Sequence, residues 1–273
     1  EMFEKAKAVC RLLVGGTSLC TGWLLGSEGH LMTNNHCIGS ASSAQNTDFM
    51  FNYQNQNCSG SSPASSDVVA SSSSLIKTNS GLDYTLVKLP VNPTNTYGYL
   101  SLSPVVASPG DRIYIPQHPG GRRKEISVRT DSDPTPGGFS RVYQSTLSGG
   151  RQLTYYADTE GGSSGSPVID YNSNLVVAIH NTGGCPNGSN GRSDSLISAI
   201  GGDMPNNGVG GQTNQGKVTL YQHCNYGGYT VGLSEGNYTL SQLQSLGARD
   251  NDISSLKVQS GYEITIYENN NFN

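Results

Sequence analysis

The chain has 273 residues, only 13% of them charged, and carries a net charge of −4 at pH 7, which argues against nucleic acid as its main partner. No run of 18 apolar residues is present, so we expect no membrane span. Thirty-five glycines, with abundant Ser, Asn and Thr, favour short strands joined by turns. The composition therefore predicts an all-β protein.

The first predicted element is a β-hairpin that ends at a histidine. Apolar runs at 23–25 and 31–32 indicate its two strands, and His36 follows the second. Cys20 and Cys37 bracket the segment, which favours a disulfide between them. A histidine beside a cysteine could instead be a metal ligand, but the other histidines show no metal-ligand spacing. We interpret His36 as a candidate general base.

A carboxylate that orients such a base should lie at the start of a buried strand. Asp83 directly precedes the segment 84–89, whose apolar residues alternate as in a half-buried strand. Asp67 lies in a serine-rich loop with no strand predicted after it, which makes it the weaker candidate. We therefore expect Asp83 to hold the histidine.

A candidate nucleophile lies in the glycine-rich segment 159–168. It contains the turn Gly162-x-Ser164-Gly-x-Pro167, which can present the Ser164 hydroxyl at a tight bend because glycine tolerates unusual dihedral angles. The backbone N–H groups of Gly162 and Ser164 can then point into one concavity, as the oxyanion of a tetrahedral acyl intermediate requires. The order His36, Asp83, Ser164 is one of the known chain orders of a catalytic triad.

Residues 1–200 resemble a trypsin-like serine protease, and among these enzymes the bacterial lysyl endopeptidases. The resemblance implies two six-stranded antiparallel β-barrels, with His36 as general base and acid, Asp83 holding its tautomer and Ser164 as nucleophile. Gly162 and Ser164 would supply the oxyanion donors, and catalysis would need no cofactor. The motifs that carry it are Cys20-Thr-Gly22, His36-Cys37, Phe51-Asn-Tyr-Gln-Asn55 with Cys58, His118-Pro119, Thr159-Glu160 and Arg192-Ser-Asp194.

Six cysteines point to an oxidising compartment, so we expect a secreted protein. No signal peptide is recognisable, which suggests a mature, processed chain. The resemblance supports the Cys20–Cys37 bond and, by analogy, pairs Cys10 with Cys58. Cys185 and Cys224 would then pair with each other.

Three residues are candidates for reading the substrate side chain. Asp194 matches the position at which lysyl endopeptidases read a cation, and Asp158 lies six residues before Ser164, where trypsin-like enzymes place their pocket carboxylate. His180 lies where glutamate-specific relatives place a histidine, although lysyl endopeptidases carry one there too. Two carboxylates favour cleavage after Lys or Arg. Arg192 could neutralise Asp194 if its side chain folded inward.

Two other functions stay open. The first is a glutamyl endopeptidase of the same fold, and the second is a catalytically silent binding or structural protein. Under the preferred interpretation the partners are protein or peptide substrates, and we expect a monomer. Segment 195–200 is predicted as the last strand of the protease-like region, which would leave it without a terminal helix.

A second domain is predicted after a Gly/Asn-rich linker at 201–216. Residues 217–273 resemble a beta/gamma-crystallin Greek-key module, a β-sandwich fold, with strands at 217–223, 229–233 and 256–258 and a short helical segment at 240–247. A second motif starts at 262–267, so we expect an incomplete module.

The same domain contains a candidate calcium loop. Asp250, Asn251 and Ser254 match the Asn/Asp-Asn/Asp-x-x-Ser/Thr-Ser pattern of crystallin-like calcium sites, and hard oxygen ligands suit Ca²⁺. The alternative is a polar turn whose side chains satisfy backbone donors.

Overall fold

The computed structural model describes residues 1–57, 62–131, 138–147, 150–210, 218–233, 235–246, 248–258 and 261–267. The chain divides into two compact units, residues 1–210 and 211–273. Strands pair antiparallel in both units, which confirms the predicted all-β fold class. Among the helices in these ranges, none is long and apolar enough to cross a membrane.

The first lobe of unit 1 is a seven-stranded sheet with the strand order β5-β4-β1-β2-β3-β7-β6. The predicted hairpin is present, with Trp23 opposite Met32, and its second strand ends at Thr33, three residues before His36. Short helices flank this sheet. The elements are α1 (Met2–Ala6), β1 (Val9–Val14), β2 (Ser18–Leu25), β3 (His30–Thr33), α2 (Ala41–Gln45), β4 (Thr47–Phe51), β5 (Asp67–Ala70), β6 (Ser74–Asn79), β7 (Tyr84–Lys88) and α3 (Thr94–Tyr97).

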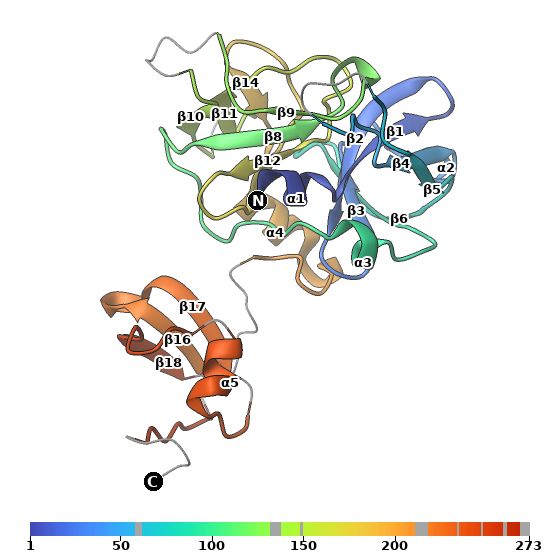
Figure 1. The fold of residues 1–273 in the computed structure, drawn as a ribbon. Coiled ribbons are helices and arrows are strands. Elements are labelled where there is room, and N and C mark those ends of the chain that lie inside the picture. The colour runs from blue at the N-terminus through green and yellow to red at the C-terminus, as the bar shows by residue number, and fades with distance from the viewer. Residues whose placement is uncertain are drawn as a thin grey trace. The chain divides into compact units, whose positions relative to one another are not determined.

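The second lobe combines a five-stranded sheet, β15-β13-β12-β8-β9, with a three-stranded sheet, β10-β11-β14. Figure 1 shows the two lobes of this unit side by side. Its elements are β8 (Ile113–Gln117), η1 (Pro119–Gly121), β9 (Glu125–Ser127), β10 (Arg141–Ser145), β11 (Leu153–Tyr156), β12 (Pro167–Asp170), β13 (Val176–Ile179), β14 (Asn187–Ser189), β15 (Gly191–Arg192), α4 (Ser193–Ile200) and η2 (Gly201–Asp203).

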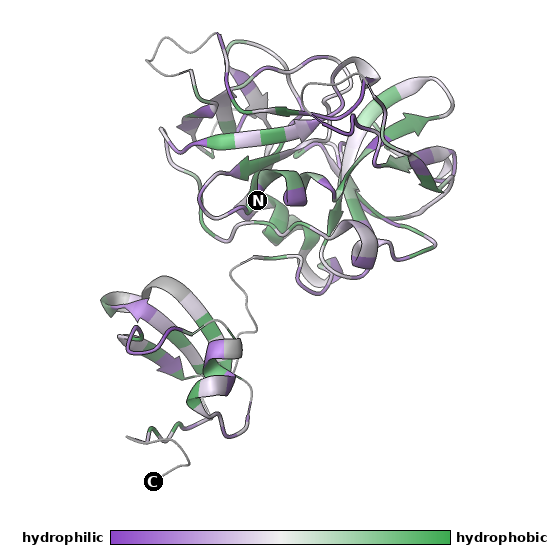
Figure 2. Cartoon of the chain, viewed as in Figure 1, coloured by the Kyte–Doolittle hydropathy of each residue, from purple (hydrophilic) through white to green (hydrophobic). Residues whose placement is uncertain are grey.

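Apolar side chains from both lobes form the core of unit 1. Trp23, Leu24 and Phe49 of the first lobe are fully buried in the same cluster as Ile169 and Ile179 of the second. In Figure 2 the hydrophobic residues follow the strands of both lobes. Burial of apolar surface across the lobes stabilises their association.

The segment at 195–200 differs from its predicted structure. Residues 195–200 were predicted as a strand, but they belong to helix α4. Leu196 and Ile200 are one helical turn apart and both fully buried, which is the spacing of one helix face and not of a strand face. Unit 1 therefore has a helix at this position in place of the predicted strand.

Residues 201–210 also belong to unit 1, although the sequence predicted a linker from residue 201. The N–H of Gly210 donates to the carbonyl of Leu102 at 2.7 Å, and the N–H of Ser27 donates to the carbonyl of Asn206 at 2.8 Å. Glycine and asparagine in this segment thus form turns that stay hydrogen-bonded to the first lobe. Residues 211–217 lie outside the described ranges.

Unit 2 contains a three-stranded sheet with the order β17-β16-β18 and a short helix. Val218, Leu220 and Val231 are buried at its centre. Residues 262–267, predicted as the first strand of another motif, form no regular strand. The elements are β16 (Val218–His223), η3 (Cys224–Tyr226), β17 (Gly227–Leu233), α5 (Leu240–Ser245) and β18 (Ser255–Val258).

Candidate active site

Two neighbouring strands bring His36 and Asp83 together. β3 pairs with β7 in the register Thr33 opposite Thr85, so the residues just after β3 lie beside those just before β7. The Nδ1 atom of His36 lies 2.7 Å from Oδ2 of Asp83, and the backbone N–H of His36 donates to Oδ1 at 3.0 Å. Asn34 donates from its side chain to the Asp83 carbonyl at 2.7 Å, which fixes the backbone of the acid as well.

Asp83 is buried but remains an acceptor. Burial alone would raise the pKa of this carboxyl. Its pKa is nevertheless lowered, because the carboxylate accepts hydrogen bonds from the His36 ring, the His36 backbone and the Asn181 side chain, and lies beside the charge of His36. Its backbone has a φ of 52°, a left-handed conformation that Asp and Asn adopt more readily than most residues. The other candidate, Asp67, starts β5 and accepts from the Tyr97 hydroxyl at 2.7 Å.

The serine turn is anchored to the first lobe through Thr21. The N–H of Thr21 donates to the Ser164 carbonyl at 2.9 Å, and its hydroxyl donates to the Gly162 carbonyl at 2.8 Å. Gly165 has a φ of 90°, and a Cβ there would lie 2.1 Å from the Thr21 carbonyl oxygen. Only glycine fits so close to β2, which explains the turn sequence.

The peptide units that carry the two expected oxyanion donors are held by their carbonyls. The Gly161 carbonyl accepts from the N–H of Gly120 at 2.6 Å, and the Ser163 carbonyl accepts from the N–H of Ser166 at 3.0 Å. In a trans peptide the N–H points in the direction opposite to the C=O. Each of these two hydrogen bonds to a carbonyl therefore also fixes the direction of the N–H of Gly162 or Ser164. Within the described part of the chain, the N–H groups of Gly162 and Ser164 have no backbone acceptor.

The Cys20–Cys37 disulfide is formed, as predicted. It joins the residue before Thr21 to the residue after His36, and Cys37 Sγ lies 3.9 Å from the Ser164 carbonyl oxygen. Cys20, His36 and Cys37 are also grouped closely enough to suggest a metal site. Because both sulfurs are bonded to each other, neither offers the thiolate that such a site needs.

The other two expected cysteine pairs involve residues that the structure does not bring together in one described unit. Cys10 is buried with a free thiol, and its expected partner Cys58 lies outside the described residues. Cys185 and Cys224 are both exposed and lie in different units, so their pairing stays a prediction.

Asp194 lies in the first turn of α4 and is paired with Arg192. Nε and Nη2 of Arg192 donate to its two carboxylate oxygens at 2.7 and 2.8 Å, and Nη1 donates to the Ser145 hydroxyl at 3.1 Å. The Arg192 guanidinium is the main cause of a lowered pKa at Asp194. The side chain of Arg192 is buried while that of Asp194 stays one-third exposed. The inward fold of Arg192 that the sequence left open is therefore realised.

Asp158 follows β11 and is exposed. Its backbone is fixed at both ends, because its N–H donates to the Ser127 hydroxyl at 3.0 Å and its carbonyl accepts from Gln117 at 2.8 Å. Asn187, buried nearby, accepts from the Thr159 hydroxyl at 2.9 Å and from the Gly184 N–H at 3.0 Å. Asn187 thus ties segment 157–159 to the loop after His180.

His180 is fully buried behind the serine turn. Its carbonyl accepts from the N–H of Gly165 and its own N–H donates to the Ser166 carbonyl, at 2.8 and 2.9 Å. Nδ1 lies 2.6 Å from the Tyr155 hydroxyl. Burial, with a smaller contribution from the nearby charge of His36, lowers the pKa of His180 to about 4. The ring is therefore neutral at neutral pH.

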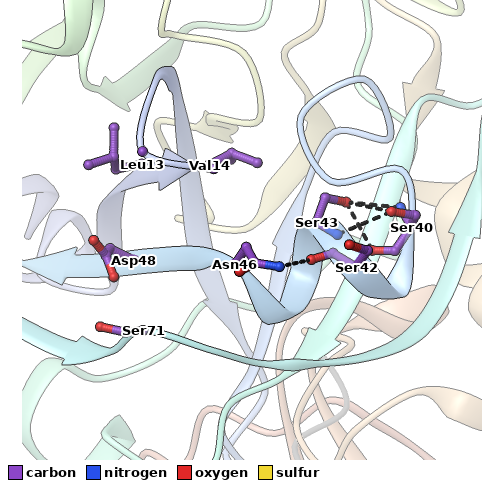
Figure 3. A pocket seen from close by; sticks show the side chains of 10 residues that line it. Leu13, Val14, Ser40, Ser42, Ser43, Asn46, Asp48 and Ser71 are labelled. Carbon is purple, nitrogen blue, oxygen red and sulfur yellow. Dashed lines mark hydrogen bonds between the residues drawn. The ribbon is translucent and has the colours of Figure 1, made fainter.

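Two further groups of residues offer polar side chains. Asp250, Asn251 and Ser254 are exposed on the loop before β18, where they offer a carboxylate, an amide and a hydroxyl. Their chemistry fits Ca²⁺, with further oxygen ligands needed to complete six to eight. Figure 3 shows an open polar hollow on the first lobe, between the end of β1 and helix α2, in which Asn46 donates to the Ser42 carbonyl.

Sequence reasoning gave no role to Thr21, Ser166 or Asn181 in holding the site. Thr21 and Ser166 lie inside quoted motifs, but their contacts to Gly162 and Ser163 are side-chain contacts that a motif does not specify. The Asn181 side chain, which follows His180 in the chain, bonds to the Asp83 carboxylate. The available signal was that each residue is close in the sequence to His36, Ser164 or His180, all of which the sequence had already singled out.

Comparison with known proteins identifies relatives of the first unit. The family model described as "Lysyl endopeptidase, C-terminal domain" matches residues 1–195. The chain is 47% identical over 194 residues to Secreted RxLR effector protein 73 of Plasmopara viticola, covering 68% of this chain and 47% of that protein. It is 40% identical over 55 residues to Development-specific protein S of Myxococcus xanthus, covering 20% and 32%. The chain thus spans less than half the length of each of these two relatives.

Solved structures share the fold at low sequence identity. The active form of the Rv3671c protease from M. tuberculosis superimposes with a TM-score of 0.53 at 18% identity, covering 73% of this chain and 82% of that one. Deg5 superimposes with a TM-score of 0.50 at 13% identity, covering 72% and 89%. These likenesses show a common fold.

Proposed function

This chain belongs to the family of the lysyl endopeptidase C-terminal domain, and we propose that it is a secreted serine endopeptidase that cleaves after lysine and, less readily, arginine. The observation that carries the proposal is the 2.7 Å contact of His36 with Asp83 beside a disulfide-anchored serine turn. Protein and peptide chains are the substrates, and the chain acts as a monomer without a catalytic cofactor.

In the proposed mechanism His36 takes the proton of the Ser164 hydroxyl as Ser164 Oγ attacks the scissile carbonyl carbon. Asp83 accepts from Nδ1–H, which leaves Nε2 as the base and stabilises the imidazolium that forms. The carbonyl oxygen becomes an oxyanion that accepts from the N–H groups of Gly162 and Ser164. His36 then protonates the leaving amine, and water hydrolyses the acyl-enzyme by the same steps.

The proposed preference for a cation rests on charge. Asp158 and Asp194 bring two negative charges and Arg192 brings one positive charge, so the three side chains together keep a net charge of −1. The one-third exposed Asp194 carboxylate can exchange part of its pairing with Arg192 for a substrate ammonium. A Lys ammonium is a compact charge on a flexible stem, whereas an arginine would compete with Arg192 for the same planar, bidentate contact.

The glutamyl alternative receives less support from His180. A neutral ring with Nδ1 already at the Tyr155 hydroxyl offers no positive charge to a glutamate. A catalytically silent protein would not need the Asp83 carboxylate to be held by three donor groups. Secretion is supported by the disulfide and by the name of one relative, a secreted effector.

For unit 2 we propose a crystallin-like module that binds Ca²⁺ through Asp250, Asn251 and Ser254. Support comes from the loop motif and from its exposed oxygen donors. The ion would have a structural role only, because the triad chemistry does not use it.

The deciding experiment combines labelling with a peptide-library digest. A serine-directed phosphonate should label the wild-type chain on Ser164, and mass spectrometry of the digest should find lysine before most cleaved bonds. Ser164→Ala should lose the label and about 10⁴-fold or more in turnover, with little change in stability. An unlabelled and inactive wild-type chain would refute the enzyme, whereas cleavage after glutamate would refute only the basic specificity.

A further inference from the structure

Ser166 makes an unusual double contact behind the serine turn. Its N–H donates to the Ser163 carbonyl at 3.0 Å, and its hydroxyl donates to the same oxygen at 2.6 Å. Ser166 is fully buried, so no water competes for this contact. The Ser163 carbonyl belongs to the peptide unit that carries the N–H of Ser164. The Ser166 hydroxyl therefore acts on the orientation of that N–H.

Thr21 makes the corresponding contact on the adjacent peptide unit. Its hydroxyl donates to the Gly162 carbonyl at 2.8 Å and accepts from the N–H of His118 at 3.1 Å. Thr21 is also fully buried. Its own carbonyl accepts from the Thr33 hydroxyl at 2.8 Å, so it is held in place from the first lobe. Two hydroxyls thus hold two successive carbonyls of the turn.

The contacts matter because both carbonyls are on the backbone between Gly162 and Ser164. The peptide unit after Ser163 carries the Ser164 N–H itself. The unit after Gly162 links it to the unit that carries the Gly162 N–H, so its orientation sets the direction of the two donors relative to each other. Glycines at 161, 162 and 165 give the turn wide backbone freedom, since glycine has access to most dihedral angles. Contacts to the carbonyls of the turn must therefore restrict that freedom.

We propose that Ser166 and Thr21 are positioning residues of the oxyanion hole, which act by fixing the Ser163 and Gly162 carbonyls with their buried hydroxyls. The inference rests on the proposed serine endopeptidase function. Neither hydroxyl touches the substrate. Both act before the reaction, by keeping the N–H donors aimed at the site where the oxyanion forms, so that no reorganisation is needed then.

The first test compares Ser166→Ala with Ser73→Ala. Ser73 is a matched control in the first lobe, because its N–H and its hydroxyl also both donate to one carbonyl, that of Ala44, each at 3.0 Å. Ser166→Ala keeps the backbone contact, so the fold should persist. We expect kcat to fall about 10- to 100-fold with KM nearly unchanged, since small misplacements of catalytic groups have effects of this size. Ser73→Ala should keep the wild-type kcat.

A second readout separates positioning from general damage. The probe is a peptide aldehyde that ends in the residue preferred in the library digest. Ser164 Oγ adds to the aldehyde carbon, and the former carbonyl oxygen then occupies the oxyanion hole. Ser166→Ala should weaken the affinity for this aldehyde by the same factor as kcat. The affinity for the cleaved product peptide, which forms no oxyanion, should not change.

Thr21→Val and Thr21→Ser test the other hydroxyl independently. Valine removes the hydroxyl at nearly constant shape and should lower kcat and aldehyde affinity together, whereas serine keeps the donor and should restore most of both. If the wild-type chain is active and the Ser166→Ala and Thr21→Val variants both keep its kcat and aldehyde affinity, this inference is wrong while the proposed function stands. Loss of product-peptide affinity to the same extent would also overturn it. A wild-type chain without labelling or turnover would overturn the proposed function and this inference with it.

Discussion

His36 donates twice to Asp83, once from its ring at 2.7 Å and once from its backbone N–H at 3.0 Å, and each contact uses a different carboxylate oxygen. Together the two contacts restrict the carboxylate plane and the orientation of the ring. The acid therefore sets both the tautomer and the direction of the imidazole. This relationship gives the first prediction.

Asp83→Asn should lower kcat by about 10⁴-fold while leaving the fold intact, because an amide can stabilise the wrong tautomer of the imidazole. Asparagine tolerates the left-handed backbone of residue 83, so the substitution changes charge and donor pattern without backbone strain. Initial rates on the preferred peptide check it. Asp67→Asn, at the exposed carboxylate that bonds to Tyr97, is the control and should keep wild-type activity.

Asp194→Asn should reduce kcat/KM on lysine substrates by about 30- to 1,000-fold, the range expected when a charge-assisted pair with the substrate is lost. Hydrolysis of an activated neutral ester should change little. Asp158→Asn serves as the comparison and should have the smaller effect. If Asp158→Asn proves the more damaging, Asp158 is the main recognition charge and arginine should be accepted as readily as lysine.

Stability should fall as the pH falls from about 6.5 towards 4. Burial lowers the pKa of His118 to about 3 and that of His180 to about 4, so both rings stay neutral in the folded chain. The unfolded chain takes up protons near a pKa of about 6.5, so it binds more protons in this window and unfolding becomes easier, by about 1 kcal/mol per pH unit for each histidine.

Urea unfolding at about pH 7, 6 and 5, followed by fluorescence of the single buried tryptophan, Trp23, measures this loss. His118→Gln should flatten the pH dependence, whereas His223→Gln, at an exposed position in unit 2, should not. Equal unfolding midpoints for the wild-type chain across this range would contradict the assignment of neutral buried histidines.

Millimolar Ca²⁺ should raise the melting temperature of unit 2, because an ion that binds only the folded state stabilises it by mass action. Scanning calorimetry of the intact chain checks the shift. Asp250→Asn should abolish it, while Asp252→Asn should not, since the Asp252 carboxylate already accepts from Gln222 at 3.1 Å. An unchanged melting temperature with Ca²⁺ would show that the loop is only a polar turn. EDTA should leave peptide cleavage by unit 1 unaffected.

The sequence predicted those features whose determinants are local. The hairpin before His36 and the strand after Asp83 follow from short apolar patterns. Segment 195–200 was assigned wrongly because the spacing of its buried residues, one helical turn apart, was not recognised.

Contacts between distant segments could not be predicted in this way. The Thr21 hydroxyl meets Gly162 across 141 positions of the chain, and no pattern in either segment encodes the meeting. The Arg192–Asp194 pair is close in sequence, but its direction depends on Ser145 and on the burial of the guanidinium. Such features become visible only in the folded structure.

The placement of the anchors has a consequence for biosynthesis. The base, its acid partner and Thr21 all belong to the first lobe, whereas Ser164 and Ser166 follow much later in the chain. During synthesis from the N-terminus the proton acceptor is thus complete long before the nucleophile emerges. A nascent chain that ends before the serine turn lacks the Ser164 hydroxyl with which to attack a peptide bond. Under the proposed mechanism, hydrolysis can begin only when the second lobe has docked, so the order of the segments itself delays cleavage until folding is nearly finished.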